Sequence, residues 1–214
     1  MGILPRSSAY ARWVGVLHLR RMNATSTEDR RVNEAKQAVA WLERSRRVRR
    51  ERIERRREAW TAGDEFGDLL TRAQIAPAAV LAGDVGRAER YANEILRIRE
   101  VALAGGAPQH VDWGADESYI AHIVLGKVAL ARGEVGAASE QLRLASRVAP
   151  PSSATLKWLG PDRELAQALL EQGEREAVVD YLTTMKDIWR RGAQQLDSWI
   201  AEIESGRTPD LSIG

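Results

Sequence analysis

Residues 122–150 read HIVLGKVALARGEVGAASEQLRLASRVAP, and this stretch decides the fold. Gly126 and Ala138 are small residues on either side of a turn at Gly133, and the stretch closes on Pro150. Two antiparallel helices can approach closely where such small residues face each other. Three apolar residues have the spacing to fill the gap between the helices: Leu125, Leu142 and Ala145. The stretch therefore predicts a helical hairpin.

This set of fixed positions resembles a tetratricopeptide repeat, a helix-turn-helix unit of roughly 34 residues with small residues at fixed points and a closing proline. A closer resemblance, to bacterial tetratricopeptide-type proteins without an assigned activity, covers residues 119–210. It is carried by residues 121–130, by residues 160–162, and by Trp189 with residues 209–210. The resemblance implies a helical-repeat fold and a bacterial, cytoplasmic setting, and it brings no catalytic residues.

Two further hairpins are expected on either side of the first one. Their helices are predicted at residues 65–81 and 86–104, and at 162–172 and 174–190. The turn glycines Gly83, Gly133 and Gly173 are 50 and then 40 residues apart, which is more than the repeat period. The third turn is expected to be one residue shorter than the second.

The extra length between the hairpins falls in residues 105–115 and 151–160, which are rich in Gly, Pro and Ser and predict loops. Pro77 lies inside a predicted helix and should kink or split it. A last helix at 193–203 suits the cap that closes a helical repeat. The pattern thus predicts an all-α fold, with antiparallel hairpins in a tetratricopeptide-like right-handed solenoid.

Charge divides the chain into two expected domains. Residues 1–62 hold 16 Lys and Arg against 7 Asp and Glu, a net charge of +9, and residues 63–214 hold 16 against 23, a net charge of −7. We therefore expect a basic N-terminal helical arm at 1–62 and a helical-repeat domain at 63–214. Such polarity suits an arm that meets an acidic partner or folds against the acidic body of its own chain.

The arm is predicted to contain two helices. Residues 8–22 carry apolar side chains at helical spacing. Thr25 and Glu28 then have the spacing of a capping box, which predicts a long helix that runs to about Trp60. The first 27 residues also have the composition of an organellar transit peptide, although an ordinary N-terminal helix is the interpretation that we favour.

Nine arginines fall between residues 43 and 58 and give this long helix two interpretations. In the first interpretation, the arginines contact nucleic-acid phosphates or an acidic protein partner. In the second, the helix is solvated or docked on its own chain, and its charges form local pairs such as Glu43–Arg47 and Glu51–Arg55. The candidate contacts are Arg46, Arg47, Arg49, Arg50, Arg55 and Arg56.

A binding surface is expected on the first helix of each hairpin. Lys127 and Arg163 suit a carboxylate or an acidic peptide, because a guanidinium can hold a carboxylate with two hydrogen bonds. Trp113, in a Gly- and Pro-rich segment, is the candidate exposed anchor, whereas Trp158 and Trp189 are expected in the core or the cap. The remaining candidates are Tyr119, Ile123, Leu130, Gln167 and Glu171.

The sequence offers few residues arranged for catalysis or metal binding. It has no cysteine, and the His and acidic residues between His110 and His122 match no metal-ligand spacing, so we expect no metal, no cofactor and no enzymatic activity. No apolar run approaches the roughly 20 residues that a membrane span needs, so we expect a soluble, cytoplasmic protein.

Three functional hypotheses remain after the sequence has been considered. The first is a non-enzymatic adaptor that binds a protein or peptide through its hairpins, and an acidic partner would suit it. The second is a nucleic-acid-associated protein that uses the arginine-rich helix. The third is a homo-oligomer in which the basic arm docks on the acidic body of a neighbour. Salt dependence separates them, because phosphate binding weakens steeply as ionic strength rises.

Overall fold

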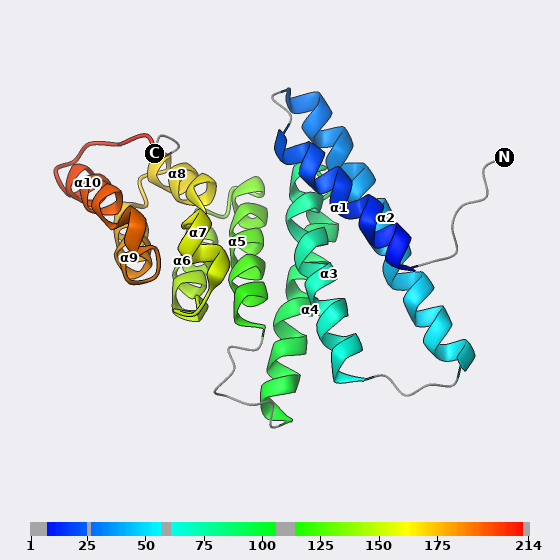
Figure 1. The fold of residues 1–214 in the computed structure, drawn as a ribbon. Helices are drawn as coiled ribbons and strands as arrows, with labels where there is room; N and C mark the ends of the chain where they lie inside the picture. Colours follow the sequence, from blue (N-terminus) through cyan, green and yellow to red (C-terminus); the bar gives the residue numbers. More distant parts are fainter. Residues whose placement is uncertain (1–7, 25–26, 57–60, 106–113, 212–214) are drawn as a thin grey trace. The chain divides into compact units, whose positions relative to one another are not determined.

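The computed structural model describes residues 8–24, 27–56, 61–105 and 114–211, and within these ranges every regular element is helical (Figure 1). The prediction of an all-α fold is therefore confirmed. The chain divides into two compact units, which we call unit 1 (residues 1–95) and unit 2 (residues 96–214). The arm expected at residues 1–62 lies in unit 1.

Unit 1 contains α1 (Ser8–Ala24), α2 (Glu28–Arg56), α3 (Ala62–Leu81) and the first half of α4 (Val85–Ala104). Helix α1 packs lengthwise on α2, and α2 also packs on α3 (Figure 1). A glycine is needed at the first contact, because a Cβ atom on Gly15 would lie 2.7 Å from Cγ of the fully buried Leu42. The expected capping box at Thr25 and the end of the helix near Trp60 lie outside the described residues.

Helix α3 differs from the prediction at two points. It begins at Ala62 because Thr61 and Asp64 form a reciprocal capping box, in which the Thr61 side chain accepts from the Asp64 N–H. It also runs through Pro77 without a break. The neighbours Ala76 and Ala78 are buried, so packing holds this turn although a proline cannot donate its backbone hydrogen bond. Of the two effects predicted for Pro77, a kink or a split, the split is therefore wrong.

Unit 2 contains α5 (Ala115–Ala131), α6 (Val135–Val148), α7 (Ala154–Leu159), α8 (Arg163–Glu171), α9 (Arg175–Ile188), the 3₁₀ turn η1 (Arg190–Gly192) and α10 (Ala193–Glu204). Helix α6 packs on both α5 and α9, α8 contacts all three, and α10 packs on α9 (Figure 1). The α5–α6 hairpin has the predicted close approach, since a Cβ on Gly126 would lie 3.5 Å from the Ala138 carbonyl oxygen.

Three hairpin turns share one geometry. Each has a glycine with positive φ, of 76°, 77° and 87° at Gly83, Gly133 and Gly173. In each turn, two backbone hydrogen bonds close the first helix. At the first turn, the Asp84 N–H donates to the Ala79 carbonyl and the Gly83 N–H donates to the Val80 carbonyl, and the other two turns have the same pattern. The expectation of a shorter third turn is wrong, because all three connect their helices through three residues.

The predicted loop at 151–160 is also corrected. Residues 154–159 form helix α7, because the Ser153 side chain accepts from the Leu156 N–H at 3.0 Å and caps the N-terminus. Gly160 ends the helix with a φ of 79°. Most of the other predicted loop, residues 106–113, lies outside the described residues.

Candidate partner-binding surface

A buried hydrogen-bonded network joins the two hairpins of unit 2. The hydroxyls of Tyr119 on α5 and Tyr181 on α9 lie 2.6 Å apart. The Asp162 N–H donates to the Tyr119 hydroxyl at 2.8 Å, and the Tyr181 hydroxyl donates to the Asp162 carbonyl at 3.3 Å. Burial raises the pKa of both tyrosines, so their hydroxyls stay protonated at neutral pH. The network fixes the entry to α8 against α5 and α9.

Lys127 lies at the edge of this network and already has partners. Its Nζ donates to Asp162 and to Glu164, each at 2.9 Å. Burial alone would lower the pKa of Lys127, but the charges of the two carboxylates outweigh it and the pKa is raised. Lys127 thus remains charged and tied to α8, so a partner carboxylate would compete with two ion pairs.

The other residues of the predicted hairpin surface are placed unevenly. Tyr119 and Ile123 are buried in the core and present no side chain to a partner. Leu130 packs partly against that core, and the Gln167 side chain accepts from the Leu211 N–H and donates to Glu171. Arg163 is partly exposed and Glu171 is exposed. Trp113 lies outside the described residues.

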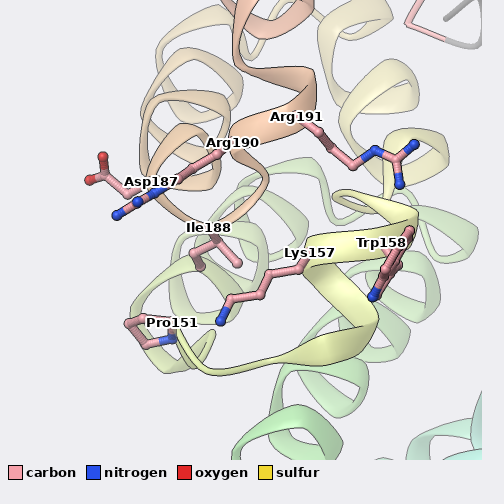
Figure 2. A pocket seen from close by; sticks show the side chains of 7 residues that line it. All are labelled: Pro151, Lys157, Trp158, Asp187, Ile188, Arg190 and Arg191. Carbon is pink, nitrogen blue, oxygen red and sulfur yellow. The ribbon is translucent and has the colours of Figure 1, made fainter.

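A pocket that the sequence analysis did not anticipate lies in unit 2 between α7, the end of α9 and η1 (Figure 2). We call it the α7 pocket. It has a volume of about 520 Å³, within the range of ligand-binding clefts. Its lining residues are Pro151, Lys157, Trp158, Asp187, Ile188, Arg190 and Arg191. Lys157 and Arg190 point to one side of it, and Trp158 and Arg191 lie on the other (Figure 2).

Exposed apolar surface accompanies this pocket. Trp158 is 71% exposed and Leu159 is 75% exposed. The expectation that Trp158 belongs to the core or cap is therefore wrong, because α7 turns this side chain outward. The guanidinium of Arg191 lies over the Trp158 ring, 5.1 Å from its centroid, which is the geometry of a cation–π contact.

The other tryptophan of this region, Trp189, is partly buried and supports the pocket. A Cβ on Gly160 would lie 2.9 Å from the Trp189 ring, and a Cβ on Gly192 would come closer still. The indole of Trp189 thus lies against the backbone at both glycines, at the end of α7 and at the end of η1. Both walls of the α7 pocket are held by this contact.

In unit 1, the predicted arginines of α2 separate into paired and free groups. Arg46 donates to Asp68 on α3 at 2.6 Å, and Arg49 donates to Asp64 at 2.9 Å. Arg55 pairs with Glu51 at 3.5 Å, as the local spacing predicted. Glu43 instead accepts from the Tyr91 hydroxyl at 2.9 Å.

The remaining α2 candidates face solvent or are not described. Arg47 and Arg50 are exposed and form no ion pair with any carboxylate that the structure describes. The Arg56 side chain lies outside the described part of the chain. Of the six candidate arginines, two are therefore exposed without an ion pair to a described carboxylate, three have carboxylate partners, and the side chain of the sixth is not described.

The described part of the chain shows neither a metal-binding cluster nor a membrane-spanning helix. The described residues include no group of three or more side chains suited to hold a metal ion. Among the described helices, none is both long enough and apolar enough to cross a membrane. Comparison with known proteins finds no significant match to a family model, a curated protein or a solved structure.

Proposed function

We propose that the protein is a non-enzymatic adaptor of the bacterial cytoplasm, which binds a peptide segment or a protein surface through tetratricopeptide-like hairpins in a right-handed solenoid. The three hairpin turns of equal length and equal hydrogen bonding support a repeated unit. The Gly126–Ala138 approach between α5 and α6 supports the same interpretation.

One observation carries the binding function. Trp158 and Leu159 are adjacent, large, apolar and mostly exposed, and Trp158 lines a pocket. Val101 and Leu103 on α4 are the other exposed large apolar side chains in the described part of unit 2, and neither lines this pocket. Exposed apolar surface beside polar groups is typical of interaction sites, and tryptophan is enriched among the residues that dominate binding energy.

The first test is a capture of cross-linked partners from bacterial lysate, with and without nuclease. We expect a protein partner that survives nuclease and is lost in a Trp158→Ala, Leu159→Ala double variant, because the exposed apolar contact is gone. An Arg47→Gln, Arg50→Gln variant serves as the control, since it alters exposed residues of unit 1. Retention of the partner by the first variant and loss by the second would contradict the adaptor proposal.

The nucleic-acid alternative is favoured by one observation: Arg47 and Arg50 on α2 are exposed and have no ion pair with a described carboxylate. In the same capture, it predicts material that disappears with nuclease and in the Arg47→Gln, Arg50→Gln variant. The homo-oligomer hypothesis predicts a mass above that of the 23.8 kDa chain in light scattering, and a return to the monomer at high salt.

A further inference from the structure

We propose that the α7 pocket binds an extended acidic segment of the partner protein, with carboxylates at the cationic side chains and an apolar side chain on Trp158 and Leu159. This inference rests on the proposed adaptor function and names the chemistry of its partner. It replaces the hairpin residues Tyr119 and Ile123, which are buried, with a surface that is exposed.

The charged side chains that line the α7 pocket are mainly positive. Lys157, Arg190 and Arg191 line the pocket, are exposed, and form no ion pair with a described carboxylate. Some other cations of unit 2 do pair with carboxylates, such as Arg143 with Asp180 at 3.9 Å and Lys186 with Asp197, whereas Arg163 forms no ion pair with a described carboxylate. These three cations, which have no ion pair with a described carboxylate, outnumber the single carboxylate of the lining and give the pocket a positive potential that an anionic segment would neutralise.

The spread of these cations selects an extended ligand. Lys157 and Arg190 reach to the side of the pocket near Pro151, and Arg191 reaches to the opposite side with Trp158 (Figure 2). Cations on two sides of the pocket suit a ligand that carries more than one anionic group. A peptide strand extends by about 3.3 Å for each residue, so a short segment with more than one carboxylate can meet both groups.

The lining favours a peptide over a nucleic acid. Pro151, Ile188 and Trp158 give the pocket an apolar component that a phosphate backbone would not use. Asp187 adds a carboxylate to the rim, which can accept a hydrogen bond from a peptide N–H, a donor that a phosphate backbone lacks. An acidic peptide with an apolar residue satisfies all three kinds of group.

The pocket is also organised before any ligand binds. The cation–π contact places the Arg191 guanidinium over Trp158, so less side-chain freedom is lost on binding. The close packing of Trp189 at Gly160 and Gly192 holds α7 and η1 in place. Two walls fixed in this way favour a ligand of one shape.

The test uses the full chain and a library of random peptides displayed on phage. We expect enriched peptides that combine Asp or Glu with a neighbouring Leu, Ile or aromatic residue. A synthetic copy of an enriched peptide, followed by fluorescence anisotropy, should bind roughly tenfold or more weakly to an Arg190→Gln, Arg191→Gln variant, since charged hydrogen bonds are lost. Binding should also weaken as salt is raised.

Two further variants keep the result interpretable. Arg147→Gln alters an exposed arginine on α6 that does not line the pocket and should leave binding unchanged. Lys157→Gln, on the exposed side of α7, should weaken binding even if the double arginine variant proves unstable by circular dichroism. Equal loss in Arg147→Gln and Lys157→Gln would overturn the inference.

The remaining outcomes separate this inference from the adaptor function. Enriched peptides that lack acidic residues, or that bind the pocket variants as well as the wild type, overturn the acidic-segment proposal while partner capture still supports an adaptor. The acidic-segment proposal is also overturned if a single-stranded oligonucleotide displaces the labelled peptide at a lower concentration than the unlabelled peptide does. Failure of both capture and peptide enrichment overturns the function together with the inference.

Discussion

Replacing Asp68 with alanine is expected to lower the free energy of unfolding by about 3–5 kcal/mol, as found when one partner of a buried ion pair is removed. Asp68 lies on α3 and is 5% exposed. It accepts hydrogen bonds from Arg46 at 2.6 and 3.3 Å and from Arg72. Its removal leaves two largely buried guanidinium groups without their shared carboxylate.

The neighbouring groups limit this loss but do not cancel it. Arg72 also donates to Glu94 at 2.8 Å, and Arg46 donates to the Tyr91 hydroxyl at 3.1 Å. Urea denaturation followed by circular dichroism measures the change. Asp68→Asn keeps the shape without the charge, so its loss should lie between wild type and alanine. A loss below about 1 kcal/mol in Asp68→Ala would show that Glu94 and Tyr91 suffice.

Acid should remove the same stabilisation. Burial raises the pKa of Asp68, but the hydrogen bonds and charges of Arg46 and Arg72 outweigh burial and the net pKa is lowered. A carboxyl with a folded pKa below its unfolded value, about 3.9, stabilises the fold above that pH and loses this contribution as pH falls through the folded pKa. Below about pH 4, the midpoint temperature of thermal unfolding should fall more steeply with decreasing pH for wild type than for Asp68→Asn. Parallel acid curves for the two proteins would contradict this assignment.

The hairpins could be predicted from the sequence because their signals are local. Gly83, Gly133 and Gly173 mark turns that need positive φ, and the apolar spacing on α8 and α9 marks buried faces. The face of α8 and α9 that carries this apolar spacing is buried in the structure. It comprises Leu165, Ala166, Leu169, Ala177, Tyr181 and Leu182.

The exposed side of α5 could not be predicted, because this helix is apolar or small around most of its circumference. Ala121, Val124 and Val128 are buried along with Tyr119 and Ile123. Periodicity identifies a face only when one side of a helix is polar. Such a helix gives no reason to place Tyr119 and Ile123 on a binding surface rather than in the core.

Contacts between distant segments were also beyond sequence reasoning. The Glu51–Arg55 pair follows from helical spacing, but Arg46 and Asp68 meet only because α2 packs on α3. The α7 pocket likewise joins residues 151–158 to residues 187–191. The available signals were Trp158-Leu159 in a segment expected to be a loop, and the two arginines that follow Trp189.

The second large effect is expected at Trp189. Its replacement by alanine should lower the free energy of unfolding by about 3–5 kcal/mol, the usual cost of removing a large aromatic side chain from a packed site. The indole contacts the backbone at Gly160 and Gly192, and it packs against the core of unit 2. Gly192→Ala should destabilise the protein by about 1–3 kcal/mol through overpacking, since its new Cβ cannot fit beside the indole.

Trp158→Ala is the matched control for Trp189→Ala, because it removes the same residue type from an exposed position. Its effect on stability should stay within about 0.5 kcal/mol, whereas its effect on peptide binding should be large. Trp189→Ala should impair both properties, because the walls of the α7 pocket lose their common support. Equal stability losses in the two variants would show that Trp158 is a packing residue, and the α7 pocket would then lose its role as a binding surface.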